Sequence, residues 1–140
     1  MTPAAANLAI KGAIHTAWVA GPNTPIAFPN VPFTPPAAPA KWLRVDLLWG
    51  NGAHVTKGVT GGRSATAGVV QLAVFGPKDQ GDGGLDTLAQ TARALFNRKR
   101  LTSPSEDVVF GPASGPVRQF EESWRSLVVS FPFQVYETVA

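Results

Sequence analysis

The feature that most limits how this chain can fold is a proline-rich stretch near its N-terminus. Residues 21–40 hold seven of the 13 prolines and no charged side chain. Proline fixes φ and lacks a backbone N–H, so the stretch forms neither a helix nor a central strand. Flexible linkers are rich in Gly and Ser, whereas here apolar side chains such as Phe28 and Phe33 lie among the prolines. We expect extended chain lying flat on a surface, either of its own domain or of a neighbouring copy.

Two other stretches have the apolar periodicity of amphipathic helices. Residues 2–20 begin with Thr2 as an N-cap and Pro3 at the first helical position, and they end at Gly21. Residues 83–98 repeat apolar side chains at helical spacing, with acidic groups at the start and basic groups at the end. The pattern predicts one helix in each stretch.

Alternating apolar and polar residues predict four strands, at 41–49, 67–75, 106–110 and 119–136. The element order is then α-β-β-α-β-β. We expect a single α/β (α+β) domain over residues 1–140. Its two helices would pack on one face of a mixed or antiparallel sheet of about four to five strands.

The segment between the first two predicted strands, residues 51–66, is rich in Gly, Thr and Ala. It is too long for a tight hairpin turn and has little to bury, so we expect a mobile arm. The groups that this arm offers to a partner are His54, Lys57 and Arg63.

The net charge of +3 is divided unevenly along the chain. Residues 1–40 carry one basic group, residues 41–100 carry nine basic and four acidic groups, and residues 101–140 carry two basic and five acidic groups. A basic middle and an acidic end either meet between copies of the chain or are scattered over a solvated surface. The basic run consists of Arg93, Arg98, Lys99 and Arg100. Its place at a helix end complements the helix dipole, and nucleic-acid binding calls for more basic charge with aromatic side chains beside it.

The sequence lacks catalytic and metal-binding motifs. It has no cysteine, and its two histidines, His15 and His54, fall in different predicted elements. A metal site needs about three or four convergent ligands. No Gly-x-Ser-x-Gly motif occurs, and the glycine-rich stretch 76–84 lacks the Lys-Ser/Thr pair of a phosphate loop. We expect no enzyme activity, no cofactor and no metal; a small hydrolase or nucleotide-binding enzyme is the weaker alternative.

The same sequence offers no membrane signal. It contains no run of apolar residues long enough to span a bilayer, and no basic leader precedes an apolar stretch. We expect no membrane partner, and a location in the cytoplasm or in a particle assembled there.

The four tryptophans divide into two pairs. Trp18 and Trp49 fall on predicted core faces. Trp42 and Trp124 fall on the more polar faces of their strands, which leaves two interpretations open. They form a peptide- or carbohydrate-binding surface, or the proline-rich segment covers them.

The order of several short motifs adds a resemblance. Asn-Val-Pro-Phe-Thr-Pro-Pro at 30–36 is followed by Lys-Trp-Leu-Arg-Val-Asp-Leu-Leu at 41–48 and by Gly62-Arg63 before a strand. Val-Gln-Leu-Ala-Val-Phe-Gly-Pro at 70–77 comes next, and then a helix ending in Leu95-Phe96. Over nearly the whole chain, this order resembles the phage tail terminator-like proteins of tailed phages with long non-contractile tails.

The resemblance implies a structural virion protein rather than an enzyme. It implies a homohexameric ring that caps the tail tube, blocks further addition of tube protein and offers a docking surface to the head connector proteins, while DNA passes through the lumen. The protein would be assembled in the host cytoplasm and lie at the head-proximal end of the tail. The nearest alternative is a neck or head-completion protein of the same particle.

Two hypotheses about contacts follow from the charge division and the arm. The subunit interface would pair the basic helix end with an acidic patch on the next copy; its residues are Arg93, Arg98 and Arg100 against Glu121 and Glu122. The arm would contact the tube or line the lumen, with Lys57 and Arg63 as its charged contacts.

Overall fold

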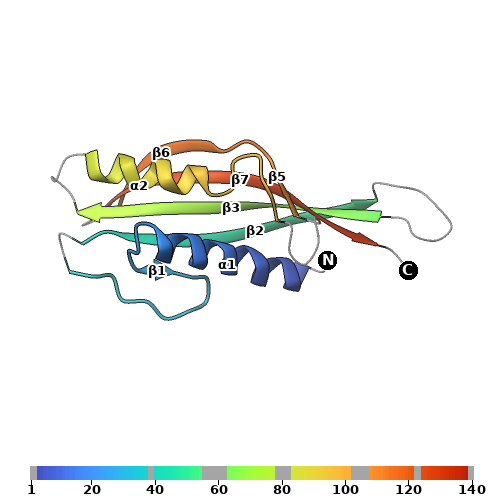
Figure 1. The fold of residues 1–140 in the computed structure, drawn as a ribbon, viewed down its shortest axis with the longest axis horizontal. Helices are drawn as coiled ribbons and strands as arrows, with labels where there is room; N and C mark the ends of the chain where they lie inside the picture. The colour runs from blue at the N-terminus through green and yellow to red at the C-terminus, as the bar shows by residue number, and fades with distance from the viewer. Residues whose placement is uncertain are drawn as a thin grey trace.

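The computed structural model describes residues 3–37, 40–54, 63–77, 83–101, 108–121 and 124–138. Two helices and one mixed sheet make an α+β arrangement (Figure 1). Along the chain the elements are α1 (Pro3–Ala20), β1 (Ile26–Ala27), β2 (Trp42–His54), β3 (Arg63–Pro77), α2 (Gly83–Ala94), β4 (Arg100–Leu101), β5 (Val108–Phe110), β6 (Ser114–Glu121) and β7 (Trp124–Thr138).

Helix α1 has the amphipathic pattern that its sequence predicts. One stripe is fully buried; it consists of Ala6, Ile10, Ile14 and Trp18. The helix ends where Asn23 adopts a left-handed φ of 53° and donates its N–H to the Trp18 carbonyl at 2.8 Å. The Trp18 indole N–H then donates to Thr24 Oγ1 at 2.8 Å. The first bond satisfies a carbonyl that the helix end leaves open, and the two bonds together start the proline-rich segment in a fixed direction.

Two long strands, β3 and β7, form the centre of the sheet and pair antiparallel over their full length. Strand β2 pairs antiparallel with the other side of β3, and the short β1 lies parallel to the start of β2. The second side of β7 is shared by β6 at its N-terminal half and by β5 further along, with β4 beyond β5. The strand order is therefore β1-β2-β3-β7-β5-β4, with β6 also on β7.

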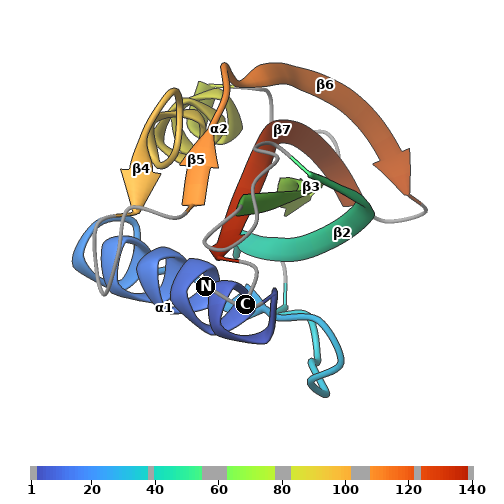
Figure 2. The same ribbon diagram turned by 90° about the vertical axis from the view of Figure 1, so that its right-hand side faces the viewer.

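Both helices pack on one face of this sheet (Figure 2). The buried stripe of α1 joins that of α2 and the inward residues of four strands in one apolar cluster. The Trp49 indole N–H donates to Asn7 Oδ1 at 3.1 Å and ties β2 to α1. Phe96, just after α2, stacks on Phe110 of β5 at 4.3 Å between ring centroids. The predicted placement of two helices on one face is confirmed.

The predicted helix at 83–98 is shorter in the structure and ends at Ala94. Arg98 adopts a left-handed φ of 55° and donates its N–H to the Gly111 carbonyl at 3.0 Å. The Phe110 N–H likewise donates to Lys99 O at 2.8 Å. Contacts with β5 and Gly111 therefore replace the last predicted helical turn. Arg93 lies in the last turn of α2, but Arg98, Lys99 and Arg100 do not lie at the helix end as predicted.

The sheet is larger than the predicted four to five strands, because the described residues contain seven. The two-residue strands β1 and β4 are too short for any alternation to reveal. The single strand predicted at 119–136 is wrong: residues 119–121 belong to β6, which pairs back on β7. Alternation continues through both strands, so the pattern alone does not locate the reversal.

The arm predicted at 51–66 is also shorter, because β2 runs to His54 and β3 begins at Arg63. A bulge between Trp49 and Gly52 shifts the register, and pairing then resumes with Gly52 opposite Thr66. Backbone ladders form there although the side chains are small and polar. Residues 55–62 lie outside the described part of the chain.

Gly68 marks a close approach in the sheet core. A Cβ added there would lie 2.5 Å from Phe133 Cζ and 2.8 Å from the Leu48 carbonyl oxygen. We predict that Gly68→Ala lowers the free energy of unfolding by about 1–3 kcal/mol, because the ring and the neighbouring strand must both move. Urea denaturation measures the change.

Gly12 is the matched control, since a Cβ there meets nothing within 4 Å on α1. Gly12→Ala should raise the free energy of unfolding by roughly 0.5–1 kcal/mol, the usual gain in a helix interior. A Gly68→Ala protein as stable as the parent would contradict this packing.

Candidate interaction surfaces

The face of the sheet opposite the helices, here called the helix-free face, carries an aromatic cluster at one end. Trp42 stacks on Phe75 at 4.0 Å between centroids, with an interplanar angle of 7°. Trp124 meets Trp42 edge-on at 5.9 Å, and Phe33 approaches it at 5.1 Å. The Arg44 guanidinium lies 4.9 Å from the centroid of the Phe75 ring, a cation–π geometry.

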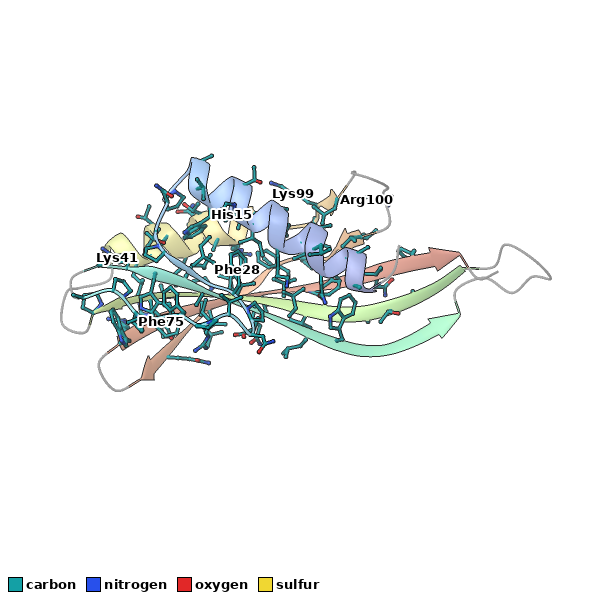
Figure 3. All side chains as sticks on the ribbon, turned by 90° about the horizontal axis from the view of Figure 1, so that it is seen from below. His15, Phe28, Lys41, Phe75, Lys99 and Arg100 are labelled. Atoms are coloured by element: carbon teal, nitrogen blue, oxygen red, sulfur yellow. The ribbon has the colours of Figure 1, made fainter. Side chains whose placement is uncertain are left out.

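The proline-rich segment covers this cluster. Its Phe33 packs against Trp42, while its Phe28 lies beside His15 of α1 at 6.5 Å between ring centroids (Figure 3). The segment therefore passes from the helix side of β2 to the helix-free face. Trp42 is only 7% exposed, so it offers no open ring face to a carbohydrate. The interpretation that the segment covers its own domain is confirmed, and a binding surface that needs an exposed Trp42 is wrong.

The other end of the helix-free face is hollowed by an apolar groove of about 560 Å³. Leu48, Val69 and Pro132 are paired across β2, β3 and β7 and therefore point to the same face. Leu48, one of the residues that line the groove, is 53% exposed. The groove is lined by Leu48, Trp49, Gly50, Ala67, Gly68, Val69, Val109, Phe110, Gly111, Pro132, Phe133 and Gln134.

Sequence reasoning missed this groove. Its one visible signal was Leu48 on the polar face of an alternating strand, beside Arg44 and Asp46. Those two charges form an ion pair at 3.3 Å, so this end of β2 has no unbalanced charge next to the apolar patch.

The basic residues predicted for a subunit interface do lie on the surface. Arg93 is exposed on α2, with Nη1 3.4 Å from the Gly115 carbonyl oxygen at the start of β6. Arg98 and Arg100 are exposed in the turn after α2 and in β4 (Figure 3 labels Arg100). Their predicted partner Glu121 is the last residue of β6, about 20 Å from Gly115 at the usual rise of a strand. Glu122 lies outside the described residues.

The predicted arm residues divide between the structure and its gaps. His54 pairs with Ser64 at the end of the β2–β3 ladder, and Arg63 pairs with Thr138 of β7. The backbone thus brings His54 and Arg63 to the same end of the sheet. Lys57 and the side chains of His54 and Arg63 lie outside the described part.

Within the described ranges, no group of three or more His, Asp or Glu side chains is placed to hold a metal ion. None of the helices in those ranges is long and apolar enough to cross a membrane.

Comparison with known proteins decides the family. The model of the phage tail terminator protein family matches residues 6–126. The chain belongs to that family. A solved structure aligns with 91% of this chain and 93% of its own chain, with a TM-score of 0.62 at 22% sequence identity. That likeness shows a shared fold alone. A search of curated proteins gives no match.

Membership of the tail terminator family makes the protein a structural component of a phage tail. The match covers both helices and the sheet as far as the first residues of β7. The surfaces described above are therefore candidates for contacts with other tail components, and the resemblance stated from the sequence is confirmed.

We predict that Trp42→Ala lowers the free energy of unfolding by about 3–5 kcal/mol, since it removes the ring on which Phe33, Phe75 and Trp124 pack. Val31→Ala, an exposed apolar residue of the same proline-rich segment, should change it by no more than about 0.5 kcal/mol. Thermal unfolding followed by circular dichroism compares the two. Equal stabilities of the two variants would show that the aromatic cluster does not stabilise the fold.

Proposed function

We propose that this tail terminator forms a ring on the finished tail tube. The ring stops further addition of tube protein and gives the head connector its docking surface. The proposal is carried by the family match over residues 6–126. It implies a heterologous contact between copies whose rotation closes, with six copies as the expected number.

The surface chemistry supports a role in assembly. Five large apolar side chains are exposed on the described surface; they are Leu8, Val19, Val31, Leu48 and Val117. None of the five belongs to the core cluster, and two of them, Leu48 and Val117, point to the helix-free face. Leu48 also lines the apolar groove of the helix-free face, and an exposed apolar patch of this kind marks a protein contact.

The division of charge along the chain supports an ionic contact between neighbouring copies in the ring. Arg93, Arg98 and Arg100 form a basic region at one end of β6, and Glu121 lies at the other end. The length of β6 separates them within one chain, so such a pairing joins different copies that are displaced along the strand. Glu122 extends the acidic end in the sequence.

The loop between β2 and β3 is proposed to contact the tube. His54 and Arg63 flank this loop, and Lys57 lies within its sequence. His54 and Arg63 at one end of the sheet, with Lys57 between them in the sequence, suit an acidic surface on the last tube ring or on the lumen side of the cap.

The central test is tail length. In a phage that lacks this gene, we expect tails longer than normal and of variable length, because nothing blocks addition of tube protein. Electron microscopy of isolated tails measures the distribution, and supplying the intact gene from a plasmid should restore one length. Tails of normal, uniform length that fail only to join heads would instead assign the protein to the neck.

The same assay tests the loop. Lys57→Glu combined with Arg63→Glu should reproduce the long tails while the purified protein stays folded. Lys11→Glu, a single basic change on α1, serves as the control. Normal tail length with the loop variant would remove the loop from the mechanism.

For the charged contact, we predict that Arg98→Glu or Glu122→Arg alone lowers the assembled fraction of the ring several-fold, and that the two changes together restore it. Exposed ion pairs contribute about 0.2–1 kcal/mol each, and the pair is repeated at every contact around the ring. Native mass spectrometry of rings released from tails reports the assembled fraction. If both single variants assemble like the parent, these residues do not pair.

A further inference from the structure

The long strands of the sheet leave two margins open. Strand β1 covers only Leu43 and Arg44 of β2. Strand β6 pairs with β7 on one side, and no strand of the described chain pairs with its other side. Figure 2 shows β2 and β6 at opposite margins of the curved sheet. An open strand edge presents a row of backbone donors and acceptors, a template for another strand.

On β2, the backbone groups of alternate residues point away from β3. The Leu43 N–H donates to the Pro25 carbonyl at 2.9 Å, so it points away from β3. In an antiparallel strand the N–H and C=O of one residue point to the same side, and the side alternates. The backbone N–H and C=O groups of Val45 and Leu47 therefore also point away from β3, whereas those of Leu48 point toward β3.

The strand directions make the two margins complementary to each other. Strands β2, β3, β7 and β6 alternate in direction, since each adjacent pair is antiparallel. If a second copy in the same orientation places its β2 beside β6, the strand directions continue to alternate across the contact. The same rotation then repeats from copy to copy, which is the heterologous contact that a ring requires.

The side chains next to both margins match as well. Leu48 on β2 is 53% exposed and Val117 on β6 is 57% exposed. Both point to the helix-free face, since Leu48 lies in one row with Pro132 and Val117 is paired with Val128 of the same strand. The apolar groove begins at Leu48, so a valine set beside it extends one apolar strip across the joint.

From these features we infer that β6 of one copy pairs antiparallel with the open edge of β2 in the next copy, with Val117 opposite Leu48. This inference rests on the proposed ring and names its contact. Pro116 has no N–H to donate, and β1 already covers β2 as far as Arg44. These two features bound the ladder to residues 117–120 against residues 45–48. A ladder this short sets the register, and the apolar strip supplies most of the buried area.

The register also gives the strand tilt of a closed sheet. Within one copy, Val117 lies in one row with Val128, Ala73 and Arg44. If Val117 of the next copy lies opposite Leu48, it meets β2 four residues beyond Arg44, where the row of the first copy ends. The row therefore shifts by four residues over the four strands β6, β7, β3 and β2. One residue per strand is the ratio of the eight-stranded barrels with a shear of eight, whose strands tilt by about 36°. Closed sheets in general tilt by about 35–45°.

Cysteine cross-linking tests this contact directly, because the chain has no cysteine of its own. Leu48→Cys and Val117→Cys are surface changes that leave the core intact. Leu48 is at a non-hydrogen-bonded position toward the incoming strand, where Cα atoms lie about 4.5 Å apart. That distance is within the range of a disulfide. The two single variants are mixed, assembled on tail tubes of the same phage, checked for rings by electron microscopy, and mildly oxidised.

We expect the mixture to give disulfide-linked dimers and nothing larger, and the variant with both cysteines to give linked chains up to the full ring. Leu8→Cys mixed with Val117→Cys is the matched control and should stay monomeric, since Leu8 is 72% exposed but lies on α1. Rings without a Leu48–Val117 disulfide would overturn the edge pairing and leave the proposed function standing. Tubes that carry no ring with the parent protein would overturn the proposed function and this inference together.

Discussion

The antiparallel ladder between β3 and β7 is the interaction on which the rest of the structure depends. It joins 15 residues of each strand, from Arg63 opposite Thr138 to Pro77 opposite Trp124. Every other strand attaches to one of these two directly or through one neighbour, and both helices bury their apolar stripes on the face that the ladder provides. Because the two strands are far apart in sequence, the fold depends on contacts of long range.

The two faces of this ladder have different roles. One is closed by α1 and α2, and its residues form the main core. The other is closed at one end by the proline-rich segment, whose Phe33 packs on Trp42, and is open at the other end around Leu48. The chain thus leaves an apolar surface around Leu48 that a partner can cover. Membership of the family implies that its partners are components of a phage tail.

How much could be predicted from the sequence depends on how local the determining forces are. The helix at α1 was predictable because Ala6, Ile10, Ile14 and Trp18 keep one period and Pro3 marks the start. The paired β2 and β3 were predictable in their alternating parts, but their extension past Trp49 was not, because ladder formation there depends on backbone bonds across a bulge. Arg98 lies outside α2, although the pattern predicted it in the helix, because its N–H donates to the carbonyl of Gly111, the residue after β5.

The candidate surfaces were less predictable than the fold for the same reason. Charges such as Arg93 and Arg100 can be read from the sequence, but their distance from Glu121 depends on the path of β6. The exposed Leu48 and Val117 become meaningful only when the sheet order places them at its two open margins. The family resemblance could be drawn from motif order, since order is preserved where single motifs are weak.

We propose that the protein acts through its shape, by closing the end of a finished tail tube. Cryo-electron microscopy of purified virions, at a resolution that traces the chain, measures this most directly. We expect a closed ring of this fold on the last ring of the tube, between the tube and the head connector. Density for the chain elsewhere in the particle, or none at that position, would contradict it.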